Sequence, residues 1–202
     1  MRKIVLLLCL GFVFGCNDTS EPRTVTTETV KPRWETVKAH PEWTSYARES
    51  LWKHGQYLLT GELKDIKDFS VKSEVNREEF ILFLLSLMVE KESYFKPSTE
   101  YKEKFKDRNG RNVISTGLFQ ISLESSNGSR YRCGMKSQAD LKDPRKNIEC
   151  SIKILNALVR EDSRIAGKVS GSWKGGARYW SVLRDTRSDA YDFIKAKMRE
   201  NF

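Results

Sequence analysis

Apolar residues recur at helical spacing along much of the chain, and this pattern predicts a mainly helical protein. Over residues 43–59 they follow one helical face, and Gly61 would end the helix. The same spacing over 147–161 and 189–199 predicts two further helices. Residues 107–116 contain Asn-Gly followed by Val and Ile, which favours a short hairpin or a loop.

The most apolar segment is residues 80–89, which would be apolar on every face of a helix. Asn76 can cap the start of this helix, with Glu79 three residues later in a variant of the capping box. The segment is too short to span a bilayer, so it belongs in the centre of a domain. Its apolar pattern ends at residues 90–92, and Pro97 closes the segment.

The N-terminal residues predict an export signal. A basic start is followed by a short apolar core, which is typical of a secretory signal rather than of a membrane span. The segment ends in Val-Phe-Gly-Cys, which resembles the bacterial lipobox, in which the cysteine is lipidated. The alternative is a buried N-terminal helix with an incidental cysteine. We therefore expect residues 1–15 to be a lipoprotein signal peptide and Cys16 to carry the lipid.

The residues that follow the signal predict a tether and one folded domain. Residues 16–40 are rich in Thr, Glu, Pro and Lys, which is typical of a flexible tether, and residues 41–202 would form the domain. Asn17 is not the Asp associated with retention in an inner membrane. We therefore expect a periplasmic protein that is lipid-anchored to the outer membrane, with the inner membrane and secretion as alternatives.

Cysteine positions agree with export. Cys9 would leave with the signal peptide and Cys16 would take the lipid, so Cys133 and Cys150 remain as a pair. A disulfide between them would stabilise the domain by about 3 kcal/mol in the chain-entropy model. The alternative, a pair of metal ligands, lacks nearby His or further Cys. We therefore expect a disulfide and no metal site.

Histidine and charge content narrow the classes of function. His40 and His54 are the only histidines in the sequence, and both precede the predicted central helix. Zinc hydrolases and Ser-His or Cys-His enzymes need imidazoles in set arrangements, so carboxylates should transfer protons here. The formal charge of +9 suits a polyanion such as the bacterial wall or nucleic acid, or simply a mixed-charge surface. Export argues against nucleic acid.

Glu92 is the carboxylate that its position singles out. It comes at the C-terminal end of the predicted buried helix, where the helix dipole and partial burial both oppose ionisation. A carboxylic acid that stays protonated near neutral pH can protonate a glycosidic oxygen. The alternative is a solvated residue at the end of a helix.

Four short elements in order resemble the soluble lytic transglycosylase domain and the related goose-type lysozymes, over residues 76–182. The first is Glu-Ser-Tyr-Phe-Lys-Pro at residues 92–97 and the second is Gly-Leu-Phe-Gln-Ile at residues 117–121, with Phe where Met is usual. Asp143-Pro144 with Asn147-Ile148 follows, and Gly-Gly-Ala-Arg-Tyr-Trp at residues 175–180 stands where the family has Ala-Tyr-Asn.

The resemblance implies a mainly helical, lysozyme-like α+β fold with a small β or loop element. It implies cleavage of peptidoglycan glycan strands between N-acetylmuramic acid and N-acetylglucosamine, by a monomer without a cofactor. Glu92 would be the catalytic acid and base. The residues that would bind substrate are Ser93, Gly117, Leu118, Phe119, Gln120 and Tyr179. The Tyr179 hydroxyl would contact the catalytic carboxyl, although a core aromatic is an equal alternative at that position.

The choice of reaction depends on a second carboxylate. Goose-type lysozymes tend to have Asp directly after the second element, and Ser122 stands there, which favours a lytic transglycosylase with one catalytic Glu. The alternatives are a hydrolytic lysozyme, including one that acts on de-N-acetylated peptidoglycan, and a non-catalytic wall-binding lipoprotein. The carboxylates close enough in sequence to serve as the second group are Glu100, Glu103, Asp107 and Glu124.

Overall fold

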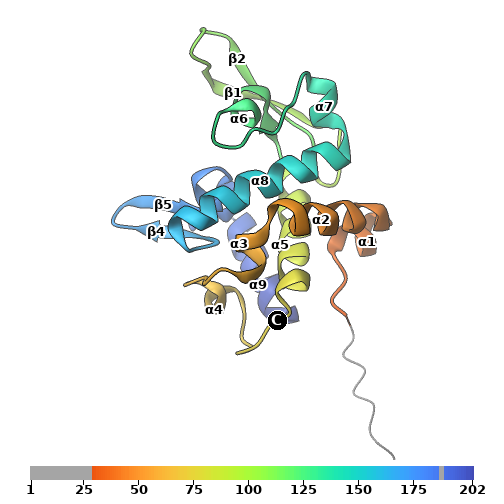
Figure 1. The fold of residues 1–202 in the computed structure, drawn as a ribbon, viewed down its shortest axis with the longest axis vertical. Helices are drawn as coiled ribbons and strands as arrows, with labels where there is room; N and C mark the ends of the chain where they lie inside the picture. Colours follow the sequence, from red (N-terminus) through yellow and green to blue (C-terminus); the bar gives the residue numbers. More distant parts are fainter. Residues whose placement is uncertain (1–28, 187–188) are drawn as a thin grey trace, which may run out of the picture.

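A computed structural model describes residues 29–186 and 189–202 (Figure 1). The predicted signal peptide, Cys16 and most of the predicted tether lie outside the described residues. Within the described ranges, no helix is long and apolar enough to cross a membrane. The helices are α1 (Arg33–Lys38), α2 (Pro41–His54), α3 (Gln56–Thr60), α4 (Ile66–Phe69), α5 (Arg77–Ser93), α6 (Leu123–Asn127), α7 (Gln138–Lys142), α8 (Pro144–Asp162) and α9 (Asp189–Asn201). The strands are β1 (Glu100–Lys106), β2 (Asn112–Thr116), β3 (Ile121–Ser122), β4 (Ala166–Val169) and β5 (Ser172–Gly175).

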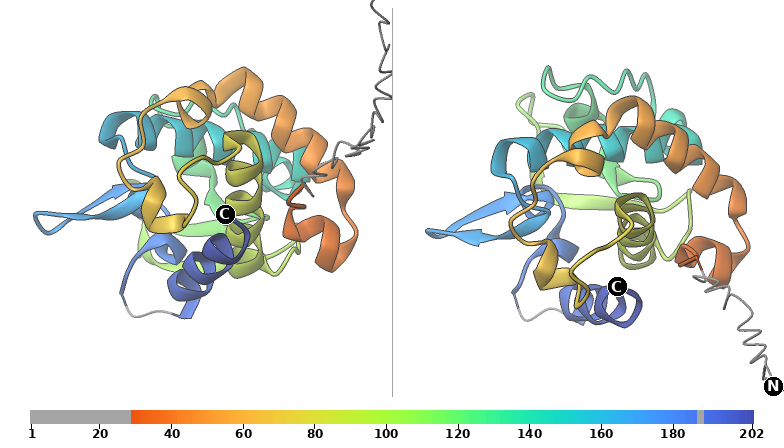
Figure 2. Two further views of the ribbon diagram at one scale, coloured as in Figure 1. Left: turned by 90° about the horizontal axis from the view of Figure 1, so that it is seen from below. Right: turned by 60° about the horizontal axis from the view of Figure 1, so that its bottom comes forward.

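Helix α5 is the centre of the fold, as the sequence predicts. Asn76 caps it by accepting a hydrogen bond from the backbone N–H of Glu79. Residues 80–89 are all buried, because α1, α2 and α3 pack against α5 and α9 covers the side opposite α2 (Figure 2). The helix ends where Tyr94 takes a left-handed conformation, with a φ of 52°.

The sequence predicts one helix over residues 43–59, and the structure divides it at Gly55 into α2 and α3. A Cβ on Gly55 would lie 2.9 Å from the carbonyl oxygen of Leu51, so the close turn requires glycine. The side chain of Asn156 on α8 then accepts hydrogen bonds from the backbone N–H groups of Tyr57 and Leu58. The new helix start is therefore capped by a different helix.

Packed structure begins before residue 41, where the sequence places the end of the tether. Trp34 on α1 is fully buried, and its indole N–H donates to Thr44 on α2 at 2.8 Å. Arg33 forms an ion pair with Glu90 of α5, and its backbone N–H donates to the Ser86 hydroxyl. Residues 33–38 are therefore part of the folded body, because one Trp supplies enough apolar surface to hold a short helix.

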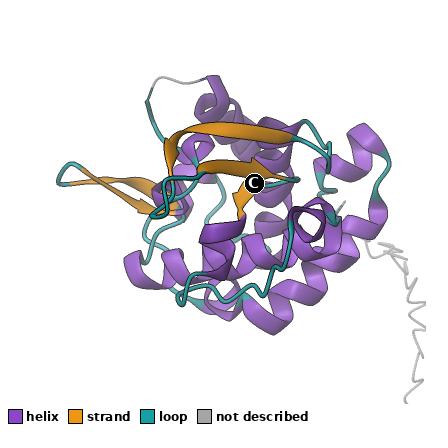
Figure 3. Ribbon diagram, turned by 90° about the horizontal axis from the view of Figure 1, so that it is seen from above, coloured by secondary structure: helices purple, strands orange, loops and turns teal. Residues whose placement is uncertain are grey.

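The two sheets are small and antiparallel (Figure 3). The first has the order β1-β2-β3, with a register shift between Lys102 and Lys106 of β1. The carboxylate of Asp107 closes the β1–β2 turn by accepting from the backbone N–H groups of Asn109 and Arg111. The expected hairpin or loop at residues 107–116 is therefore the turn and second strand of a hairpin. Strands β4 and β5 form the second sheet, which the sequence does not predict.

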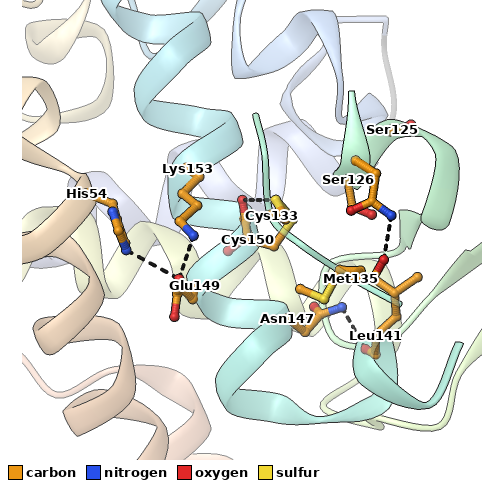
Figure 4. Close-up of a disulfide and its surroundings, with 12 residues drawn as sticks. His54, Ser125, Ser126, Cys133, Met135, Leu141, Asn147, Glu149, Cys150 and Lys153 are labelled. Carbon is orange, nitrogen blue, oxygen red and sulfur yellow. Dashed lines mark hydrogen bonds and ion pairs between the residues drawn. A yellow bond between two sulfur atoms is a disulfide. The ribbon is translucent and has the colours of Figure 1, made fainter. Parts of the chain in front are cut away.

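The predicted disulfide is present between Cys133 and Cys150 (Figure 4). Cys150 is in α8, and Cys133 belongs to the loop that connects α6 to α7. Asp143 caps α8 through the backbone N–H of Lys146, and Pro144 is its first residue, which matches the third sequence element. The disulfide therefore ties the loop between α6 and α7 to α8.

Asn147 on α8 connects the helix to the turn between β2 and β3. Its amide nitrogen donates to the carbonyl oxygens of Thr116 at 3.2 Å and Leu141 at 2.8 Å, and its amide oxygen accepts from the backbone N–H of Phe119 at 2.9 Å. The Asn147 side chain is fully buried. A single amide thus satisfies three backbone groups that water cannot reach.

We predict that Asn147→Ala lowers the free energy of unfolding by about 3 kcal/mol, because it leaves buried backbone groups without partners. Urea denaturation followed by circular dichroism measures the loss. Asn112→Ala, at an exposed position at the start of β2, is the control and should stay within about 0.5 kcal/mol of wild type. Equal stability of the two variants would contradict the role given to Asn147.

Candidate active site

A cleft of about 730 Å³ opens between the β1–β2 hairpin and the segment that precedes α9. Of the site residues that the sequence names, Glu92, Gln120 and Tyr179 line it. They come from the end of α5, the turn between β2 and β3, and the segment after β5. Within the part of the chain that the structure describes, no group of three or more His, Cys, Asp or Glu side chains is arranged to hold a metal ion.

Glu92 lies in the last turn of α5, at the inner wall of the cleft. The pKa of its carboxyl is raised from the ordinary 4.5 to about 8, first by burial and second by repulsion from the Glu103 carboxylate, and the Arg184 guanidinium partly opposes both. The side chain is therefore a protonated acid near neutral pH. The sequence anticipates this state from burial and the helix end, and the structure adds the two charged neighbours.

Glu103 is the functional candidate that sequence reasoning leaves unresolved. Of the carboxylates close to Glu92 in sequence, Glu100 and Glu103 line the cleft, whereas Asp107 and Glu124 line a neighbouring hollow. Glu100 forms an ion pair with Lys142 at 2.9 Å. Glu103 instead accepts a hydrogen bond of 2.6 Å from the Ser115 hydroxyl on the paired strand. Within the described residues no cation forms an ion pair with Glu103, and a carboxylate that is oriented in this way suits a base.

The turn over residues 117–120 forms one wall of the cleft. Gly117 has a φ of +84°, and a Cβ there would lie 2.1 Å from the Leu141 carbonyl oxygen, so only glycine fits. Gln120 also has a positive φ, of 48°. Its side-chain nitrogen donates to the carbonyl oxygens of Thr99 and Gly117, so the amide group shapes the turn while facing the cleft.

Three residues that the sequence assigns to substrate binding are buried in the structure. Leu118 and Phe119 have no exposed surface and belong to the hydrophobic core. Ser93 is 6% exposed, and its hydroxyl donates to the carbonyl oxygen of Val89 within α5. These assignments are corrected: the side chains hold the cleft wall and the end of α5 in place and do not face the substrate.

Tyr179 lines the cleft together with Glu92, and its predicted contact with the catalytic carboxyl stays a prediction. Burial raises the pKa of the Tyr179 phenol, and hydrogen bonding to Ser125 and Ser122 partly opposes this. Throughout the described residues, no hydrogen bond joins Tyr179 to Glu92.

We predict that Glu92 makes the protein less stable as pH rises from 4.5 to 8. Between its ordinary pKa and its raised native pKa, the native state keeps a proton that the unfolded chain has released, so stability falls with rising pH. Glu92→Gln removes this pH-dependent loss of stability. We compare the free energies of unfolding of the variant and the wild type by urea titration, and the difference in favour of the variant should be larger at pH 8 than at pH 5. Glu100→Gln is the control and should keep the wild-type pH dependence; a constant difference for Glu92→Gln would refute the raised pKa.

Comparisons with known proteins agree with this geometry. The profile of the Transglycosylase SLT domain matches residues 70–188, and no curated protein matches the chain significantly. The solved structure of wild-type DslA from Bdellovibrio is similar at 45% identity with a TM-score of 0.80, over 85% of this chain and 96% of that one. Two Glu-to-Gln variants of DslA match at 44% identity with TM-scores of 0.79 and the same coverage.

The family match covers more than half of the chain, and it includes the helix, the hairpin and the turn that form the cleft. The likeness to DslA covers 85% of this chain. The chain belongs to the SLT transglycosylase family of enzymes that cleave the glycan strands of peptidoglycan.

Proposed function

We propose that the protein hydrolyses peptidoglycan glycan strands between N-acetylmuramic acid and N-acetylglucosamine, with Glu92 as acid and Glu103 as base. The observation that carries the proposal is the placement of two different carboxyl groups in one cleft: buried Glu92, whose pKa is raised, and Glu103, which the Ser115 hydroxyl orients. Inverting glycosidases use such a pair, one group to protonate the leaving oxygen and the other to activate water.

The reaction can be written for these two side chains. Glu92 gives its proton to the glycosidic oxygen as the bond to C1 of muramic acid breaks. Glu103, held by the Ser115 hydroxyl, takes a proton from a water molecule whose oxygen forms the new bond to C1. One water is added in total, and exchange of a proton with solvent restores both carboxyl groups.

The spacing of the two residues in sequence supports the same pair. Glu92 and Glu103 are eleven residues apart. The two variant structures of DslA replace glutamates that are also eleven positions apart in that protein. The sequence favours a single catalytic Glu because Ser122 replaces an expected Asp, and that argument weakens once a carboxylate reaches the cleft from β1 instead.

Lytic transglycosylation is the second candidate reaction, and it is favoured by the match to the Transglycosylase SLT domain. In that reaction Glu92 protonates the leaving oxygen, and the 6-hydroxyl of muramic acid then attacks C1 and gives its proton back to the Glu92 carboxylate as the anhydro sugar forms. Glu103 would then have no role as a base. The two reactions therefore differ in their products by one water and in their need for Glu103.

We also propose that the enzyme is an exported lipoprotein of the periplasm, anchored at Cys16 to the outer membrane. The support comes from the sequence: a basic start, a short apolar core and a lipobox-like ending. The family acts on peptidoglycan, and this substrate supports a location in the cell envelope.

We predict that digests of purified walls contain reducing muramic acid ends when analysed by mass spectrometry. Glu92→Gln should abolish cleavage, and Glu103→Gln should lower the rate by about 100-fold or more, as expected for loss of a general base. Glu100→Gln is the matched control, because it changes a carboxylate of the same strand and cleft that is already paired with Lys142.

Anhydromuramic ends, or full activity of Glu103→Gln, would overturn the hydrolytic reaction in favour of the lytic one. The same digest is run on de-N-acetylated walls, because their free amines would pair with the unneutralised Glu103 carboxylate. Faster cleavage of these walls would identify the de-N-acetylated glycan as the preferred substrate, and slower cleavage would identify the acetylated form.

We predict that a bacterium expressing the full chain incorporates labelled palmitate into it and that Cys16→Ser prevents this. Labelled protein is detected after membrane fractionation, which also assigns the membrane. Cys9→Ser is the control and should label normally, because this residue lies within the predicted signal peptide. Labelling of Cys16→Ser at the wild-type level would refute the anchor.

A further inference from the structure

Two large aromatic side chains on β1 lie exposed at the cleft. Tyr101 is 52% exposed and Phe105 is 62% exposed, and both line the same cleft as Glu92. Glu103 lies between them in sequence and faces the cleft as well. Because all three residues line the cleft, β1 presents ring, carboxylate and ring to it.

These two rings differ from the other exposed aromatic side chains. The ring of Tyr94, which is 54% exposed, is covered by the Lys38 ammonium at 4.8 Å. Trp52, 59% exposed, donates its indole N–H to Glu78 at 2.8 Å. Neither Tyr101 nor Phe105 has an aromatic or cation–π partner in the part of the chain that the structure describes. Their faces are therefore available to a ligand.

The position of the two rings and the groups around them indicate which class of ligand binds there. Exposed apolar surface beside polar groups marks a binding groove, and this groove is continuous with the catalytic cleft. A pyranose ring has C–H faces that pack on aromatic rings and hydroxyl edges that need polar partners. Gln120 and Arg178 line the same cleft and supply such partners. A glycan strand meets both requirements.

We propose that Tyr101 and Phe105 form an aromatic shelf on which sugar rings of the glycan strand stack next to the scissile bond. The proposal deepens the function proposed above and rests on it for the identity of the glycan. The two residues are four positions apart on β1, which is at most about 13 Å of backbone, so the rings can contact different sugars of one glycan strand. The shelf would hold the glycan against Glu103.

The shelf is tested by binding in the absence of cleavage. Uncrosslinked glycan strands prepared from purified walls are titrated calorimetrically into Glu92→Gln. A second substitution in this Glu92→Gln protein, either Tyr101→Ala or Phe105→Ala, should weaken binding of the strands about three- to tenfold, as loss of an aromatic contact predicts. Adding the conservative changes Tyr101→Phe or Phe105→Tyr should keep the dissociation constant within about twofold of the parent, because the ring remains.

Trp52→Ala is the matched control, since it removes an exposed aromatic ring that does not line the cleft, and it should leave binding unchanged. In the active enzyme, the two alanine variants should raise KM about three- to tenfold with little change in kcat. Unchanged binding by both alanine variants would overturn the shelf. Residual cleavage by Glu92→Gln would instead count against the proposed function, so the two failures are distinguishable.

Discussion

The cleft depends on the contact between Asn147 and the turn over residues 116–120. That turn bends through two positive φ angles, at Gly117 and Gln120, and the bend leaves backbone groups pointing into the protein. The Asn147 amide satisfies three backbone groups around it, and Gly117 lets the turn approach α8 closely enough for this to happen. The indole N–H of Trp180 adds a hydrogen bond to the Phe119 carbonyl oxygen from the opposite side. The wall is thus fixed by buried polar contacts, which tolerate little displacement.

A fixed wall matters because the acid and its charged neighbours come from different parts of the chain. Glu92 is carried by the central helix, Glu103 by the hairpin and Arg184 by the segment before α9. The pKa of Glu92 depends on burial and on both neighbours, so it depends on how these parts are held together. The same burial makes ionised Glu92 costly to the fold. The protein keeps a residue that lowers its stability at the catalytic position, as expected where function and stability compete.

The sequence predicts the parts of this structure that local pattern determines. The all-apolar helix, its Asn76 cap and the disulfide pair follow from spacing and residue type, and the family elements lead to Glu92. The break at Gly55 is missed because the cap that supports it comes from Asn156, about a hundred residues away in sequence. Strand β1 is missed because its many charged residues obscure the alternation of apolar and polar residues that is typical of a strand. The assignment of the Phe119 side chain to substrate binding is wrong because a motif does not tell which of its side chains turn into the core.

The position of the base and the aromatic rings on one strand has a consequence for how the enzyme would work. If a glycan packs on Tyr101 and Phe105, it covers the strand that carries Glu103 and removes water from around Glu92. Both effects strengthen electrostatic interactions in the cleft, because fewer solvent dipoles screen them. Substrate binding and the protonation states of the two carboxyl groups would then be coupled through a single element. The hairpin, rather than the helix that carries the acid, is therefore where we expect the specificity of the enzyme to be set.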